Sequence, residues 1–187
     1  MTYGVFPVLD IPQQVVYTYW EALDAADLLR YRLCDLKNPT VADVETMVKQ
    51  FGQSMYNVYD PAEERLVAEF ALTNFTGKSA QVHFSMHPAN KPQRSMQLAR
   101  EVTDQILNQW SEQGNPDAPY LYSLYGLTPT CNRVACAFVQ RVGFKKIGVL
   151  KGGQRFAGEI ADAMITVKEM SDGRQQRRQQ QTGGSSI

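Results

Sequence analysis

The sequence lacks any apolar run that could cross a membrane, since none reaches the roughly 18 residues that a spanning segment needs. It also lacks an excess of charge of either sign, because 19 basic and 19 acidic side chains give a formal net charge of +0. Such a chain carries no global field that would draw it to nucleic acid or to an anionic membrane. We therefore expect neither a membrane protein nor a nucleic-acid-binding protein.

Cysteine is scarce as well, with three residues at Cys34, Cys131 and Cys136. Their spacing does not match that of metal-ligand sets, so no metal centre is expected. The first residues do not place a basic region before an apolar one, which is the pattern of a secretory signal. An odd number of cysteines without such a signal fits a reducing compartment. The sequence therefore predicts a cytoplasmic protein whose cysteines pack as small apolar side chains.

The chain does contain enough apolar material for one full core. With 187 residues, 43% of them hydrophobic, it is predicted to fold as a single domain over residues 1–170. The remaining segment, 171–187, contains almost no apolar side chain and is predicted to be disordered in isolation. Its arginines could contact phosphates or a partner, but a solvated tail is the simpler interpretation.

Helices and strands are expected in an order that indicates an α/β fold with a mixed sheet. Apolar residues at helical spacing predict helices over 14–35, 41–51, 93–113 and a short stretch after Asn132. Thr40 is expected to cap the second helix and Gly52 to end it. Alternating or aromatic stretches predict strands over 65–74, 79–87, 120–128, 144–150 and 162–167, with an edge strand or arm at 3–11. Loops or turns are expected at 114–119 and 152–153.

The most specific pattern lies in residues 128–150. Pro129 disfavours helix before it, Asn132 can cap a helix, and Gly143 can end that helix in a left-handed turn. The pattern N-x-x-A-x-x-F-x-x-R-x-G-F is made by Asn132, Ala135, Phe138, Arg141, Gly143 and Phe144. An ordinary helix with a glycine cap could share it, because short motifs recur by chance. The order of the flanking elements decides between the two interpretations.

Both the pattern and the order of elements resemble the Gcn5-related N-acetyltransferase (GNAT) superfamily, over residues 40–169. The resemblance implies a mixed, mostly antiparallel sheet with a splayed central strand pair and helices on both faces. It implies acetyl-coenzyme A (acetyl-CoA) as the cofactor. The helix with Asn132, Ala135, Phe138 and Arg141 would then lie beside the pantetheine arm.

A loop that leads into the helix at 93–113 would hold the pyrophosphate of coenzyme A, because a helix N-terminus offers free backbone N–H groups. In the family this loop carries R/Q-x-x-G-x-G/A. The corresponding residues here are Gln93, Arg94, Ser95, Met96, Gln97, Leu98 and Ala99. Either Gln93 or Arg94 could take the first position, and with Arg94 there, Ser95 and Gln97 replace the usual glycines. The alternative is the first turn of an ordinary helix.

Acetyl transfer also needs groups that polarise a carbonyl and move protons. The resemblance implies a polarising backbone N–H in the stretch Phe84, Ser85 and Met86. The candidate bases are Glu69, His83 and His87, although solvated or hydrogen-bonded side chains would also explain them. Val139 stands where the family often has a tyrosine that protonates the leaving thiolate. Tyr125 or Tyr122 is therefore the candidate general acid, with solvent as the alternative.

Two functions are compatible with these residues. The first is an N-acetyltransferase that moves an acetyl group from acetyl-CoA to a primary amine of a protein or small molecule, by direct attack in a ternary complex. The second is a GNAT-like binding or assembly module without catalysis, which the replaced glycines and tyrosine favour. The chain also resembles acetyltransferase-like proteins of tailed bacteriophages, in which case it would lie in the host cytoplasm or the virion. Its partner would be a second copy of the chain or a phage or host protein.

Overall fold

The computed structural model describes residues 3–113 and 115–171, so most of the predicted disordered tail lies outside the described residues. The helices are α1 (Gln13–Ala25), α2 (Leu29–Arg32), α3 (Val41–Phe51), α4 (Pro92–Asn108) and α5 (Arg133–Val142), with 3-10 helices η1 (Val8–Asp10) and η2 (Gly52–Ser54). The strands are β1 (Gly4–Pro7), β2 (Met55–Asp60), β3 (Arg65–Thr76), β4 (Ser79–Met86), β5 (Ser111–Glu112), β6 (Asn115–Pro119), β7 (Ser123–Pro129), β8 (Lys145–Phe156) and β9 (Glu159–Glu169). None of the described helices is long and apolar enough to cross a membrane.

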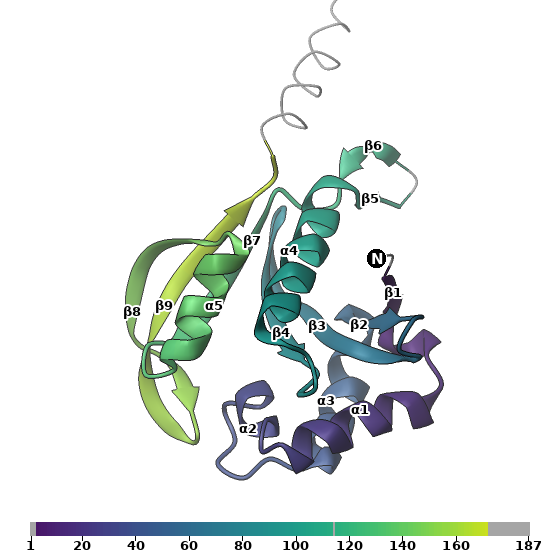
Figure 1. Cartoon of the computed structure of the whole chain (residues 1–187). Coiled ribbons are helices and arrows are strands. Elements are labelled where there is room, and N and C mark those ends of the chain that lie inside the picture. Colours follow the sequence, from purple (N-terminus) through teal and green to yellow (C-terminus); the bar gives the residue numbers. More distant parts are fainter. Residues whose placement is uncertain (1–2, 114, 172–187) are drawn as a thin grey trace, which may run out of the picture.

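One large sheet organises the molecule, with strands in the order β1-β2-β3-β4-β7-β9-β8 (Figure 1). Neighbouring strands in this sheet are antiparallel except β4 and β7, which run parallel. The predicted mixed, mostly antiparallel sheet is therefore confirmed. β2, from a segment that the predicted order left out, pairs with β1 and β3.

The parallel pair at the centre of the sheet is short. β4 and β7 are paired from Ser79 to Gln81 and from Ser123 to Tyr125. Beyond these residues β4 continues to Met86 and β7 to Pro129, and the two strands diverge (Figure 1). β3 stays paired with β4, and β9 with β7, along the diverging parts. The sheet thus opens in its middle while both halves stay intact, as the predicted splayed strand pair requires.

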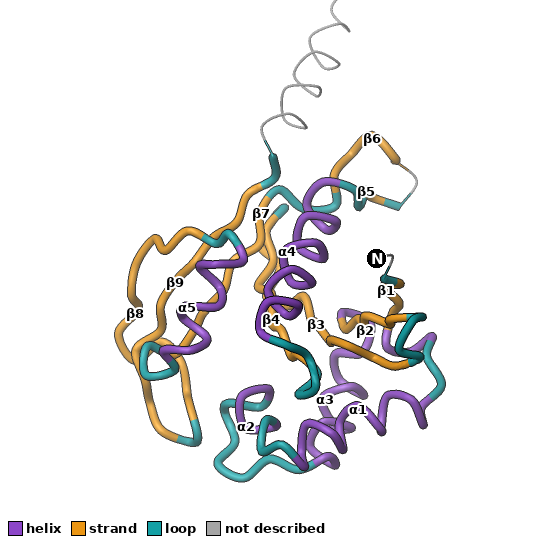
Figure 2. The backbone as a smooth tube through the Cα atoms, in the orientation of Figure 1, coloured by secondary structure: helices purple, strands orange, loops and turns teal. Residues whose placement is uncertain are grey.

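Helices cover both faces of the sheet (Figure 2). Phe70 of β3 belongs to a core with Leu98 of α4. Ala71, the next residue, belongs to a second core with Trp20 of α1 and Val44 of α3. Successive side chains of a strand point to opposite faces, so α4 covers one face and α1 and α3 cover the other. This arrangement confirms the prediction of helices on both faces.

The single helix predicted over 14–35 is interrupted, and that prediction was wrong. α1 ends at Ala25 and α2 begins at Leu29, with Asp27 between them at φ 54°. Aspartate tolerates this left-handed conformation better than most residues, and it turns the chain there. Hydrophobic spacing does not reveal one left-handed residue. The turn brings α2 into contact with β4.

Two expected irregular segments are strands. The turn predicted at 152–153 lies inside β8, where the pairing with β9 shifts register after Leu150. A glycine pair suits such a bulge as well as a turn. The turn instead falls at Ala157 and Gly158, with φ of 53° and 82°. The loop predicted at 114–119 contains β6, which pairs with β5.

By contrast, α3 has the predicted bounds. Thr40 forms a capping box with Asp43, and its backbone N–H donates to Asp43 Oδ2 at 2.8 Å. Gly52 follows the last residue of the helix. The residues that start and end this helix, Thr40, Asp43 and Gly52, lie in it or directly beside it. The local sequence is therefore enough to predict its bounds.

Candidate active site

A pocket of about 510 Å³ occupies the opening between β4 and β7. The end of β4 lines it with Val82, His83, Phe84, Ser85 and Met86. Side chains from both faces of β4 reach the pocket because the strand has no neighbour on this edge. The first turns of α5 line one end, called here the α5 end, while α2 and the last residues of β8 line the other, called the α2 end.

The open edge of β4 also presents backbone donors. Directly before β4, the Lys78 carbonyl accepts from the Ser123 N–H of β7 at 3.3 Å. On the other edge, the His87 N–H donates to the Val67 carbonyl at 3.0 Å. Backbone groups alternate between the two edges, so the N–H groups of Phe84 and Met86 point toward the opening.

The α5 end is largely apolar, and its polar groups have local partners. Asn132, Ala135 and Phe138 line it, and Asn132 Oδ1 accepts from the Ala135 N–H at 3.1 Å. Gly143 ends the helix at φ 110°, which confirms the predicted left-handed turn. Arg141 does not line the pocket; it is exposed, and its carbonyl accepts from Arg100 Nη2 at 2.6 Å.

The α2 end contains a buried ion pair. Arg32 lines the pocket, and its Nε donates to Glu69 Oε1 at 2.7 Å. Trp20 Nε1 donates to Glu69 Oε2 at 3.0 Å. The side chains of Arg32 and Glu69 are 6% and 1% exposed. Glu69 does not line the pocket, and its two oxygens accept hydrogen bonds from Arg32 and Trp20.

His83 is the ionisable side chain that β4 contributes to the pocket. Its Nε2 lies 2.9 Å from Thr73 Oγ1. Burial, and then the charge of Arg32, lowers the pKa of His83 from 6.5 to about 4, so the ring is neutral at pH 7. His87 lies outside the pocket, where its Nδ1 accepts from the Ala89 N–H at 3.1 Å.

Tyr19 of α1 forms a hydrogen bond with the backbone of the same strand, β4. Tyr19 is buried, and its hydroxyl donates to the Ser85 carbonyl at 2.7 Å. Burial, and then the charge of Glu69, raises the pKa of Tyr19 above its ordinary value. The hydroxyl therefore keeps its proton and holds β4 in place. None of the described clusters of His, Cys, Asp and Glu could hold a metal ion.

Solved structures that are similar to this chain include several acetyltransferases. A GNAT-family acetyltransferase from Bacillus anthracis matches with a TM-score of 0.64 at 13% identity, covering 91% of this chain and 96% of that one. RimL, a ribosomal L7/L12 α-N-protein acetyltransferase in complex with coenzyme A, matches with a TM-score of 0.65 at 12% identity, covering 90% and 94%. The microcin C7 self-immunity acetyltransferase MccE, in complex with acetyl-CoA and AMP, matches with 0.64 at 12%, covering 89% and 92%.

The chain has the fold of the GNAT acetyltransferases. No family model matches the sequence, and no curated protein matches it either. At these identities the likeness shows the fold alone, so the residues of the pocket must carry any statement on chemistry.

In this GNAT fold, the segment 93–99 forms the first turns of α4. Lys91 is the N-cap and Pro92 has no N–H, while the first helical bond runs from the Ser95 N–H to the Lys91 carbonyl at 3.0 Å. The N–H groups of Gln93 and Arg94 precede that bond and are the ones a helix N-terminus offers to an anion. This part of the prediction is compatible with the structure.

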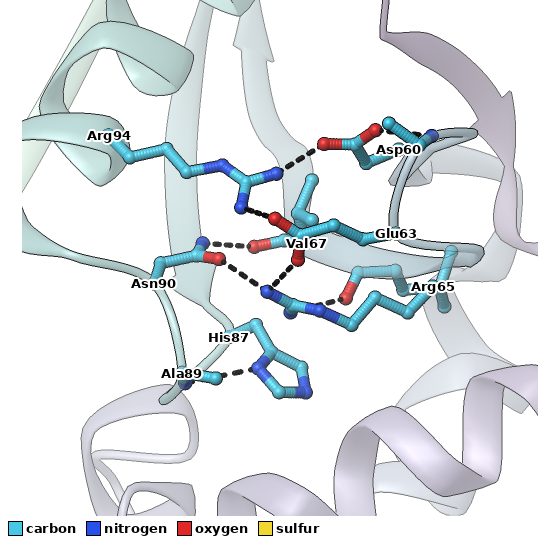
Figure 3. A network of polar contacts seen from close by, with 10 residues as sticks. Asp60, Glu63, Arg65, Val67, His87, Ala89, Asn90 and Arg94 are labelled. Atoms are coloured by element: carbon cyan, nitrogen blue, oxygen red, sulfur yellow. Dashed lines mark hydrogen bonds and ion pairs between the residues drawn. The ribbon is translucent and has the colours of Figure 1, made fainter.

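The side chain of Arg94 is already engaged. It pairs with Asp60, the last residue of β2, and with Glu63, in the connection between β2 and β3 (Figure 3). Glu63 also pairs with Arg65, whose Nη2 donates to Asn90 Oδ1 at 3.2 Å. The hydrogen bond from Arg94 lowers the pKa of Glu63, so this carboxylate keeps its charge. The network connects the start of α4 and the loop before it to β2, to β3 and to the turn between these two strands.

The remaining predicted site residues lie away from the pocket. Leu98 and Ala99 are fully buried on the core-facing side of α4, Ser95 is buried, Met96 is half-buried, and Gln97 donates to Glu101 at 2.8 Å. None of the residues 93–99 lines the pocket. Tyr125 lies where β7 is still paired with β4, and its hydroxyl donates to the Asn74 carbonyl at 2.9 Å.

The site residues predicted from the sequence did not include those of the α2 end. Tyr31, Arg32, Cys34, Gln154 and Phe156 line it. Arg32 meets Glu69 across 37 residues of sequence, and no local pattern encodes that contact. Cys34 packs against Gln154, and burial raises the pKa of its thiol, which makes it a poor nucleophile.

Proposed function

We propose that the protein is an N-acetyltransferase that moves an acetyl group from acetyl-CoA to a primary amine. The observation that carries the proposal is the pocket in the opening between β4 and β7, with backbone donors on one wall and a neutral histidine beside them. The fold is shared with acetyltransferases that were solved with coenzyme A and acetyl-CoA, which supports this assignment.

The residues present fit coenzyme A at most points. At the α5 end, the small Ala135 and the apolar Phe138 leave room for a flexible chain. The N–H groups of Phe84 and Met86 suit its carbonyl oxygens, and those that open α4 suit its phosphates. The side chain of Arg94 does not fit as well, because Asp60 and Glu63 hold it.

Acetyl-CoA supplies a thioester: the amine nitrogen bonds to its carbonyl carbon, the carbon–sulfur bond breaks, the amine loses a proton and the sulfur gains one. We assign the polarisation of that carbonyl to the backbone N–H groups of Phe84 and Met86, because donors fixed on a strand need no rearrangement. His83 is neutral at pH 7, and we assign it the tautomer whose Nε2–H donates to Thr73 Oγ1, because this leaves a lone pair on Nδ1 to accept the proton from the amine.

The other two predicted catalytic residues receive different roles in the proposal. Glu69 has both oxygens engaged by Arg32 and Trp20, so we assign it to positioning Arg32. Tyr125 bonds to Asn74 outside the pocket, so we assign the proton that reaches the sulfur to solvent.

The alternative function, a GNAT-like binding or assembly module without catalysis, is favoured by one observation. Arg94 is the one basic side chain in residues 93–99, and its ion pairs with Asp60 and Glu63 withdraw it from a phosphate. The expectations of a second copy or of a phage or host protein as the partner, and of a cytoplasmic location, stay predictions.

Isothermal titration with acetyl-CoA tests the proposed function. We expect a Kd in the micromolar range, which is about −8 kcal/mol. The variant Ala135→Trp places an indole in the α5 end of the pocket and should weaken binding by at least about tenfold, or ~1.4 kcal/mol. Gln140→Trp adds the same indole to an exposed position on α5 that does not line the pocket, and it serves as the matched control.

Circular dichroism shows whether both variants remain folded. Absence of heat with folded wild-type protein at several temperatures would contradict the proposal and favour the binding module. Equal weakening by Ala135→Trp and Gln140→Trp would show that acetyl-CoA does not occupy the α5 end.

A further inference from the structure

The α2 end of the pocket contains buried polar atoms without partners. Arg32 donates its Nε to Glu69, while its buried Nη2 has no hydrogen-bond partner in the described part of the chain. From β8, Gln154 Nε2 lies 3.1 Å from Cys34 Sγ, and the buried Oε1 of the same amide is also without a partner among the described residues. Unpaired buried polar atoms cost free energy, so native proteins usually pair them with protein, water or ligand.

Glu69 and Trp20 fix the position of the guanidinium. The Glu69 carboxylate accepts hydrogen bonds from Arg32 Nε at 2.7 Å and from the indole N–H of Trp20 at 3.0 Å. Neither contact uses the terminal nitrogens of Arg32. A guanidinium held by one edge presents its remaining donors in a fixed direction, which suits a carboxylate or carbonyl oxygen.

The other side chains at this end set the rest of the ligand. Leu23, Leu28 and Phe156 give it an apolar wall. None of the described residues that line the pocket is acidic, so a polycationic acceptor would meet no carboxylate. The complementary acceptor has an amine, an oxygen close to that amine, and an apolar side chain.

This inference rests on the proposed acetyl transfer. We propose that the acceptor is an α-amino carbonyl compound with an apolar side chain, whose oxygen accepts a hydrogen bond from Arg32 while its amine reaches His83. A free amino acid and the first residue of a peptide share this chemistry. Arg32 is then a specificity-determining residue, and Glu69 is the residue that positions it.

Thiol release from acetyl-CoA, measured with three matched amines, tests the inference. L-leucine and L-leucinamide carry the oxygen, whereas 3-methylbutylamine has the same side chain without it. In wild-type protein, kcat/KM for the better of the two leucine compounds should exceed that for 3-methylbutylamine by about 10- to 100-fold. A preference for leucine identifies a free amino acid, and a preference for leucinamide identifies a peptide N-terminus.

The double variant R32M/E69Q removes the guanidinium without leaving the Glu69 charge unpaired. It should lose most of the ratio between the leucine compounds and 3-methylbutylamine. Because the same amines are compared in both proteins, differences in amine basicity cancel. Arg30→Met removes an exposed guanidinium two residues away, paired with Asp27, and should keep the wild-type ratio.

The outcomes separate the inference from the proposed function. A ratio near one in wild-type protein, or a ratio that R32M/E69Q leaves unchanged, overturns the inference while any transfer upholds the proposed function. Binding of acetyl-CoA without transfer to any of the three amines also overturns the inference. Failure to bind acetyl-CoA at all overturns both. Titration of R32M/E69Q with acetyl-CoA shows whether its cofactor site is intact.

Discussion

On the α4 and α5 side of β4, the side chains of Asn132 and Arg94 keep some contact with solvent, whereas on the α1 and α2 side those of Arg32 and Glu69 are buried. Asn132 caps its own helix, and Arg94 pairs with the buried carboxylate of Asp60 and the exposed one of Glu63. Across the strand, Arg32, Glu69 and His83 lie in surroundings that leave little water to solvate a charge.

The proposed function explains this difference in burial. A surface that binds a long cofactor needs a complementary groove and backbone donors, and these lower the free energy of unfolding very little. A surface that selects an acceptor needs a fixed charge, and fixing a buried charge requires a buried counter-charge. Substitutions on the α1 and α2 side should therefore cost more stability than those on the other side.

The largest effect is expected for Glu69→Gln, which leaves the buried Arg32 without its counter-charge. The free energy of unfolding should fall by about 3 to 5 kcal/mol. The double variant R32M/E69Q should lose clearly less than the sum of the losses in Glu69→Gln and Arg32→Met, because the two residues share one interaction. Urea unfolding of the four proteins measures this, and additive losses would contradict the buried pair.

The next effect concerns His83, whose pKa is lowered from 6.5 to about 4 in the folded state. The unfolded chain binds the proton more readily between these values, so the stabilisation is complete above pH 6.5 and is lost as the pH falls toward 4. The loss should be about 3 kcal/mol. We would compare wild-type protein with His83→Gln by urea unfolding across this pH window. A difference in stability that does not change with pH would refute the assignment.

A smaller effect is expected at the α5 end. Asn132→Ala removes the side chain that caps α5 and should lower the free energy of unfolding by about 1 kcal/mol. Asn132→Asp keeps an oxygen that can accept from the Ala135 N–H and should stay near wild type. Thermal unfolding of the three proteins checks this, and equal losses in both variants would show that the cap contributes little.

The smallest effect is expected in the network around Arg94. Glu63→Gln removes one of its two carboxylate partners (Figure 3), leaves the ion pair with Asp60, and should increase the attraction of Arg94 for phosphate. Exposed ion pairs are weak, so acetyl-CoA affinity should rise by only about two- to fivefold at low salt and less at high salt. Glu64→Gln, one residue along and also exposed, is the control. A fall in acetyl-CoA affinity in Glu63→Gln but not in Glu64→Gln would contradict the claim that Glu63 withdraws Arg94 from phosphate.

The two sides also differ in how far the sequence predicts them. α5 could be predicted because its determinants, Asn132 at the start and Gly143 at the end, lie within ten residues of each helix residue they affect. The order of strands was also indicated, although β2 was left out. On the other side, one left-handed residue, Asp27, redirects the chain and brings Arg32 to Glu69. Neither the turn nor the contact leaves a periodic pattern.

Segment 93–99 falls between these cases. Its helix start was predicted, but the partners of Arg94 come from the end of β2 and from the connection between β2 and β3. A motif aligned by sequence alone could not tell an arginine free for phosphate from one held by two carboxylates.

Residue-resolved amide hydrogen exchange along β4, with and without coenzyme A, tests the central claim most directly. The claim is that the cofactor lies in the opening between β4 and β7. Coenzyme A should slow exchange at Phe84 and Met86, whose N–H groups face the opening, and leave Ala80, which is already paired with β7, unchanged. Slower exchange confined to other parts of the molecule, or none in protein saturated with coenzyme A, would contradict the account.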